Sequence, residues 1–154
     1  MTDILLNQMT ITPVAGDAVF APNVMLSGCR LVKTLAKDIV APTPLKLVAG
    51  SDKEIILDIA GANDVVFGVL KREPQKSVWK KNEICGIFRA NDIVWLTAAA
   101  KTVAGEKVYF DANNKVNKTG TGNLPEAGIA LTSAEANALV AVSLTCQYGK
   151  ASAS

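Results

Sequence analysis

Few residues of this chain have the types and spacing that catalysis requires. The sequence contains no histidine, so it can build neither a Ser-His-Asp nor a Cys-His nucleophile, nor a metal site that uses imidazole. Its three cysteines, Cys29, Cys85 and Cys146, are too widely spaced for a paired metal-ligand motif, and their odd number favours reduced thiols in a reducing compartment. We expect them to be small core residues, and we predict no metal site and no cofactor.

Two short motifs resemble those of enzymes that use serine and lysine. SVWK, from Ser77 to Lys80, fits S-x-x-K, and KTG, from Lys118 to Gly120, fits the lysine motif of penicillin-binding enzymes and β-lactamases. That mechanism needs the serine at the start of a long helix, but no long helical pattern follows Pro74 and the S-D-N motif is missing. We therefore predict that the protein is not an enzyme.

Two further segments begin like ligand-binding loops and then depart from the pattern. GTGNLP, residues 120–125, opens like a dinucleotide fingerprint, but Pro125 replaces the third glycine and no long helix follows. DANNK, residues 111–115, opens like a calcium loop, but Lys115 stands where a third oxygen ligand is required. A surface loop and a β-turn explain the two segments better.

The segment KREPQKSVWKK, residues 71–81, places five basic side chains around Trp79. Such a segment could hold a nucleic-acid backbone and stack a base, but Glu73 and Glu83 dilute its charge. The formal net charge of the chain is only +2, far below the basic excess of nucleic-acid-binding domains. We predict an exposed loop or a protein contact anchored by Trp79, and no nucleic-acid partner.

The elements that must position these residues have the pattern of β-strands. From Leu45 onward, apolar segments of strand length alternate with clusters of Gly, Asn and Asp about every ten residues, which is typical of a sandwich or barrel. Near the C-terminus, Val140, Val142 and Leu144 alternate with smaller or polar residues, so one face should lie in a core. We predict a mainly β fold, a small β-barrel or β-sandwich.

The best helical candidate is TSAEANAL, residues 132–139. Thr132 and Glu135 stand at capping-box spacing, where each side chain can accept a backbone N–H of the first helical turn. Because the segment is so short, we expect at most one short helix.

Two stretches of the chain resemble each other. PLKLVAGSDKEIILDIAGANDVVFGVL, residues 44–70, and GEKVYFDANNKVNKTGTGNLPEAGIAL, residues 105–131, each contain a strand, a turn, a second strand, and a loop with Gly and Asn before a closing apolar strand. A shorter similarity joins VAGDAVF, residues 14–20, to VAGEKVY, residues 103–109. These similarities predict two related β units that share one core, with chance similarity between simple β sequences as the alternative.

The ends of the chain differ from its middle. We expect an extended N-terminal arm over residues 1–14, a β domain over 15–149 and a flexible tail over 150–154. MTDILLNQM has an acidic residue where a signal peptide is basic, and no segment approaches the ~18 apolar residues of a membrane span, so we predict no membrane partner. Ile4, Leu5 and Leu6 have no obvious apolar partner within the domain, which predicts an arm laid on a neighbour or, alternatively, an edge strand of the same domain.

From Val65 onward the order of the segments resembles the bacteriophage structural cement, or head decoration, family. The residues that carry the resemblance are VVFGVLK (65–71), EICGIFRANDIVWLTAAAKTVAGEKVYFDANNKV (83–116) and AGIALTSAEANALVAVSL (127–144). The basic segment 71–81 departs most from the family pattern. The resemblance implies a small β-rich protein, without catalytic residues, that is made in the host cytoplasm and binds the capsid surface of the virion, often as a trimer that clamps neighbouring major capsid proteins.

A different class of function remains as the alternative, namely a non-enzymatic β-rich module that binds a small ligand or a carbohydrate. Such a module needs a concave pocket with converging polar and aromatic groups. Only 5% of the residues are aromatic, so the sequence offers little material for one.

Overall fold

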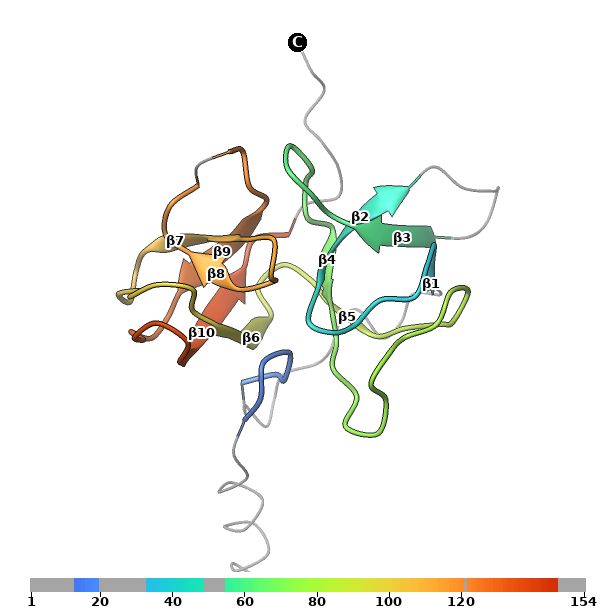
Figure 1. The fold of residues 1–154 in the computed structure, drawn as a ribbon, viewed down its shortest axis with the longest axis horizontal. Coiled ribbons are helices and arrows are strands. Elements are labelled where there is room, and N and C mark those ends of the chain that lie inside the picture. The colour runs from blue at the N-terminus through green and yellow to red at the C-terminus, as the bar shows by residue number, and fades with distance from the viewer. Residues whose placement is uncertain (1–12, 20–32, 49–54, 121, 147–154) are drawn as a thin grey trace, which may run out of the picture.

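The computed structural model describes residues 13–19, 33–48, 55–120 and 122–146. In this part of the chain, ten strands form two five-stranded sheets and no helix is present (Figure 1). The first sheet has the order β1-β3-β2-β4-β5, with β1 at Lys33–Leu35, β2 at Pro44–Val48, β3 at Ile55–Ile59, β4 at Gly68–Leu70 and β5 at Ile87–Phe88. The second has the order β6-β10-β9-β7-β8, with β6 at Ile93–Thr97, β7 at Lys107–Phe110, β8 at Val116–Asn117, β9 at Glu126–Ala130 and β10 at Leu139–Leu144.

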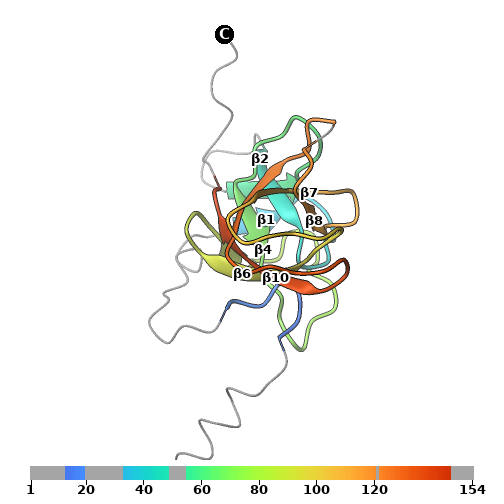
Figure 2. The same cartoon turned by 90° about the vertical axis from the view of Figure 1, so that its left-hand side faces the viewer.

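The second sheet closes on itself. Just after β6, Ala98 forms a parallel bridge with Val116 of β8, and the N–H of Ala99 donates to the carbonyl oxygen of Val116 at 2.7 Å. Figure 2, with this sheet toward the viewer, shows the strands wrapping around one centre. The alternating side chains predicted for the last strand, Val140, Val142 and Leu144, are fully buried in that interior. The prediction of a mainly β fold, a small β-barrel or β-sandwich, is confirmed.

Two neighbouring strands of the first sheet, β4 and β5, contribute side chains to two different cores. In β4, Val69 packs against the interior of the second sheet, whereas Leu70 belongs to a separate cluster on the opposite face. In β5, Phe88 and Ile87 divide in the same way, because successive side chains of a strand point to opposite faces. The two sheets therefore share one core, as the sequence predicted, while the first sheet adds a second core of its own.

The two sheets contain the same four-strand arrangement. The order β3-β2-β4-β5 is repeated as β8-β7-β9-β10, and every pair within it is antiparallel. We call residues 33–88 the first unit and residues 93–144 the second unit. The internal similarity of the sequence therefore corresponds to two units of related topology.

Hydrogen bonds outside the strands repeat as well. In the first unit, Ile39 and Trp79 exchange two backbone hydrogen bonds of 2.9 Å, before β2 and before β5. In the second unit, Thr102 and Ala134 exchange two backbone hydrogen bonds of 2.9 Å at the corresponding positions, before β7 and before β10. Both pairs close the unit at the same end, so the likeness extends beyond the apolar pattern of the strands.

An asparagine in left-handed conformation occupies corresponding positions in the two units. Asn82, with φ of 66°, donates its N–H to the carbonyl of Leu35 at 2.9 Å. Asn137, with φ of 68°, donates to the carbonyl of Ala98 at 2.7 Å. Asparagine adopts this conformation at low cost. Chance similarity between β sequences does not account for the agreement.

The segment 132–139 forms no helix, although its spacing fits a capping box. The hydroxyl of Thr132 instead accepts the N–H of Ala141 at 3.0 Å, and the backbone of Ala134 pairs with Thr102. The carboxylate of Glu135 reaches Lys101 at 3.6 Å. Backbone groups that a helix would have used form hydrogen bonds with distant segments instead, so tertiary contacts override the weak helical preference of this segment.

A four-residue turn with an acidic last residue recurs five times in the described residues. In each turn the carboxylate accepts the N–H of the first residue at 2.6 to 2.9 Å, and the third residue is Gly or Asn with positive φ. The turns are Val14–Asp17, Gly61–Asp64, Lys80–Glu83, Arg89–Asp92 and Val103–Glu106. The similarity between VAGD and VAGE in the sequence is thus a similarity of turns.

Candidate functional site

Of the four residues predicted to contact a partner, the structure describes only Trp79. Ile4, Leu5 and Leu6 lie outside the described residues, so their assignment stays a prediction. Trp79 is 7% exposed, and its Nε1 donates to the carbonyl of Lys71 at 3.0 Å. The ring therefore belongs to the core of the first unit. A contact with a partner at Trp79, which also stays a prediction, would involve mainly the side chains that surround the ring.

Intrachain ion pairs neutralise much of the basic segment 71–81. Four of its basic side chains have carboxylate partners, in the pairs Lys71–Glu73, Arg72–Asp17, Lys76–Glu83 and Lys80–Asp38. The bond from Lys76, together with the N–H of Lys80, lowers the pKa of Glu83, and the N–H of Lys81 lowers the pKa of Asp38. Little unpaired positive charge remains here to attract a phosphate backbone.

The loop between β4 and Trp79 is longer than its counterpart in the second unit. Residues 71–78 separate Leu70 from Trp79, whereas only residues 131–133 separate Ala130 from Ala134. The second unit closes without the additional residues, so the topology of the unit does not require them. The loop has eight residues where its counterpart has three, an insertion of five, and we call residues 71–78 the inserted loop.

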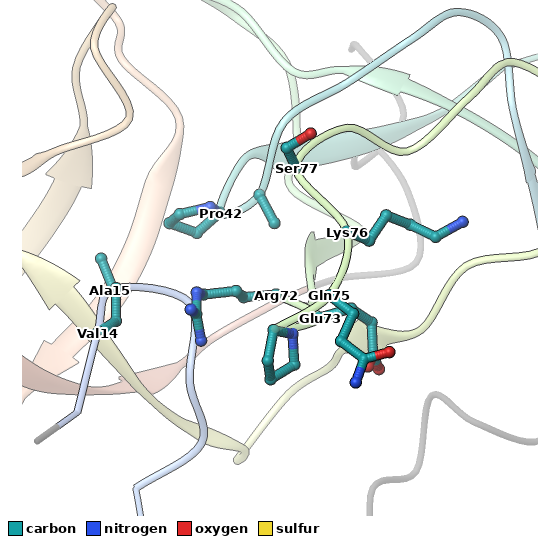
Figure 3. Close-up of a pocket in the computed structure, with 10 residues that line it drawn as sticks. Val14, Ala15, Pro42, Arg72, Glu73, Gln75, Lys76 and Ser77 are labelled. Atoms are coloured by element: carbon teal, nitrogen blue, oxygen red, sulfur yellow. The ribbon is translucent and has the colours of Figure 1, made fainter. Parts of the chain in front are cut away.

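The inserted loop forms one wall of a groove that also runs along Ala41 and Pro42 of the first unit and along Val14 and Ala15. The groove has a volume of about 560 Å³, with Arg72 and Lys76 on one side and Val14 on the other (Figure 3). A hollow of about 250 Å³ adjoins it beyond Pro42 and extends to residues 113–115 of the second unit. The two share Ala15, Ala41 and Pro42, and we call them together the inter-unit groove.

Residues 14–19, which we call the arm root, tie the two units together beside this groove. The N–H of Gly16 donates to the carbonyl of Trp95 at 2.7 Å, and the N–H of Trp95 donates to the carbonyl of Asp17 at 2.9 Å. Toward the first unit, the N–H of Arg72 donates to the carbonyl of Gly16 at 3.3 Å, and its guanidinium lies 3.1 Å from the Asp17 carboxylate. The arm root thus extends the second sheet and contacts the inserted loop.

The groove offers shape and apolar surface rather than reactive groups. Val14 is 46% exposed and Val40 is 55% exposed, both at its rim, while Arg72 and Lys76 are engaged in ion pairs. Within the described residues, no group of three or more His, Cys, Asp or Glu side chains could hold a metal ion. Such a surface is suited to contact with another polypeptide.

Both described cysteines are core residues, as expected. Cys85 is 3% exposed and Cys146 is 7% exposed, whereas Cys29 lies outside the described part of the chain. Burial raises the pKa of the Cys146 thiol to about 12, which leaves it protonated and a poor nucleophile. Across the described ranges, the chain forms no helix long and apolar enough to span a membrane.

Sequence reasoning found the inserted loop but missed the groove. The sequence indicated that residues 71–81 are unusual, yet Val14 and Pro42 carry no local signal of a shared surface. The one relevant signal in the sequence is the VAGD turn, residues 14–17, because it repeats the VAGE turn of residues 103–106 but lies outside the two similar stretches.

The comparisons with known proteins agree with this architecture. A family model described as phage cement protein matches residues 51–144, which is more than half of the chain. Among solved structures, the chain is similar to the crystal structure of the head fiber gp8.5 N base in bacteriophage phi29, with 14% sequence identity and a TM-score of 0.53, covering 80% of this chain and 97% of that one. At this identity the likeness shows the fold alone. Among curated proteins, no significant match was found.

Proposed function

Because this chain belongs to the phage cement protein family, we propose that it binds the outside of the assembled phage head and stabilises contacts between neighbouring major capsid subunits. The family is one of structural proteins rather than enzymes. The match over residues 51–144 carries the proposal, since these residues include strands of both units and the inserted loop.

The physical basis of this function is linkage between binding and assembly. A protein that binds the assembled shell, but not its separated subunits, shifts the equilibrium toward the shell in proportion to the binding free energy at each site. Many copies on one head multiply a modest contact. The core shared by the two units supports this role, because it resists relative movement of the two surfaces that would face different capsid subunits.

Several finer features belong to the same proposal. The protein is made in the host cytoplasm, assembles as a homo-oligomer, for which we propose a trimer, and is displayed on the capsid surface of the virion. Its N-terminal arm, residues 1–14, lies on a neighbouring molecule through Ile4, Leu5 and Leu6. The arm root supports this view, because it fixes the start of the arm beside an exposed apolar rim.

Purified protein mixed with undecorated heads tests the proposal directly. Sedimentation and electron microscopy should show saturable binding, and decorated heads should break open at a higher temperature than undecorated heads. A protein that stays in the supernatant as a monomer would contradict the proposal and favour a small-ligand module.

Deletion of residues 2–12 tests the arm separately. The truncated protein should keep the circular dichroism spectrum of the β fold but occupy fewer sites on the heads. Unchanged occupancy would show that the arm makes no contact with a neighbour.

A further inference from the structure

We propose that the inter-unit groove of one copy binds residues 1–12 of the N-terminal arm of a second copy of this chain. The inference rests on the proposed self-association and names the surface that receives the arm.

The wall of the groove is an addition to the duplicated unit. Residues 71–78 stand where the second unit has only residues 131–133, and six residues of this loop, from Arg72 to Ser77, line the groove. The second unit forms its equivalent backbone pair, Thr102 with Ala134, without such a loop. Most of the loop, from Arg72 to Ser77, therefore lines a surface that the second unit lacks.

The arm begins at the groove that we propose for it. The described chain starts at Pro13, and Val14 and Ala15 already line the groove. Proline fixes φ and restricts the residue before it to extended conformations, so a tight reversal into the same groove is disfavoured. Twelve extended residues span about 40 Å, whereas a chain of this length has a radius of gyration of about 15 Å, so the arm can reach a neighbouring copy.

The rim of the groove suits the apolar side chains of the arm. Ile4, Leu5 and Leu6 form the first apolar run of the chain. The groove presents Val14 at 46% exposure and Val40 at 55%, next to Pro42. Covering these side chains removes apolar surface from water on both partners.

Exchange of arms also explains how a closed oligomer forms. Each copy has one arm and one groove, so donating the arm to the next copy in a fixed direction closes a ring when the rotation is right. The same arm bound in its own groove would leave a monomer, and this is the outcome that the experiment must distinguish.

Disulfide trapping between two different chains tests the exchange. One chain carries Leu5→Cys and the other Gln75→Cys, in the exposed inserted loop, both with Cys29→Ser. Mild oxidation of the mixture should yield a heterodimer about tenfold above a control mixture in which Ala62→Cys replaces Gln75→Cys, since docking raises the effective concentration of the two thiols. Ala62 is exposed in the turn after β3 and is not among the groove residues.

The alternative outcomes overturn the inference in different ways. A chain that carries both Leu5→Cys and Gln75→Cys would form only an internal disulfide if the arm occupied its own groove. A heterodimer no more abundant than the Ala62→Cys control would show that the arm binds elsewhere. If the cysteine variants show no arm exchange but still decorate heads, the proposed function stands without it. Failure of the wild-type protein to bind heads would instead overturn the proposed function itself.

A charge at the rim provides a second, independent readout. Val40→Asp should shift the sedimentation profile from oligomer to monomer, and Leu131→Asp is the matched control, because Leu131 is 46% exposed but does not line the groove. Equal oligomerisation of the two variants would contradict the inference.

Discussion

At the scale of single residues, Gly128 illustrates how closely the strands of the second unit approach. A Cβ placed on Gly128, where φ is +155°, would lie 1.9 Å from the backbone oxygen of Ser143. The corresponding strand of the first unit has the same constraint, since a Cβ on Gly68 would lie 2.8 Å from the backbone oxygen of Phe88. A glycine at this position is therefore a packing requirement of both units.

Gly128→Ala should destabilise the protein severely, because the atom that a Cβ meets belongs to the backbone of a central strand and cannot turn aside. We expect a loss of about 3 kcal/mol or more in the free energy of unfolding, measured by urea denaturation followed by circular dichroism. Gly61→Ala is the control, because its Cβ would meet nothing closer than Asp64 Oδ2 at 3.7 Å. Equal stability of the two variants would rule out this account of the strand contact.

The buried thiol of Cys146 should be unreactive in the folded protein. In a Cys29→Ser background, Ellman's reagent at pH 8 should label the native protein slowly and label it fully once it is unfolded. Rapid labelling of the native protein at Cys146 would contradict the burial of this residue.

The raised pKa of Cys146 also predicts a pH dependence of stability. The unfolded chain loses its thiol proton near the ordinary pKa of 9.0, whereas the folded chain keeps it until about pH 12. The unfolded state therefore binds fewer protons in this window, and the contribution of Cys146 to stability is present below pH 9.0 and falls as pH rises toward 12. Cys146→Ala should show a flatter decline over the same range in urea denaturation.

At the scale of elements, the arm root connects two parts of the fold that the sequence keeps far apart. Asp17 binds Arg72 at 3.1 Å, and both side chains are about 30% exposed, at 30% and 31%. The N–H of Gly16 and the carbonyl of Asp17 both form backbone hydrogen bonds with Trp95 of the second unit. This small segment therefore holds the inserted loop against the second unit.

A double-mutant cycle of Asp17→Asn and Arg72→Met should measure a coupling of about 0.5 to 1 kcal/mol, because the pair is partly exposed and screened by solvent. The matched control is a cycle at Lys101 and Glu135, a pair at 3.6 Å that is 71% and 77% exposed, for which we expect no measurable coupling. Similar coupling in the two cycles would show that the arm root adds nothing beyond a surface ion pair.

At the scale of the whole molecule, the duplicated units depend on one another. Val69 and Phe88 of the first unit are buried in the same cluster as Val94, Leu96 and Phe110 of the second unit. Neither unit can expose this cluster to water without losing apolar burial on both sides. The protein should therefore unfold as one body despite its internal repeat.

The two tryptophans make this cooperativity measurable, since Trp79 lies in the first unit and Trp95 in the second. Urea denaturation of Trp79→Phe and Trp95→Phe, each followed by the fluorescence of the remaining tryptophan, should give the same cooperative width and fall to baseline together with the circular dichroism signal of the same variant. A fluorescence transition separated from the circular dichroism transition in either variant would indicate independent units.

The sequence by itself determined those features that depend on local backbone preferences and periodicity. The alternation of side chains indicated strands, the Gly and Asn positions indicated turns that need positive φ, and the similarity of residues 44–70 to residues 105–131 indicated two related units. The lack of histidine excluded whole classes of chemistry, because no fold can supply a missing side chain.

Only the tertiary structure decided which distant residues share a surface. In the structure, Trp79 lies in a core and the basic loop forms ion pairs with Asp17 and Glu83. Residues 132–139, the candidate helix, instead pair with Thr102 through the backbone of Ala134. These outcomes depend on how two sheets pack, which local preference does not encode. The groove arises in the same way, because its lining combines the arm root, residues 40–42 and 72–77 of the first unit, and Thr97 with residues 113–115 of the second unit.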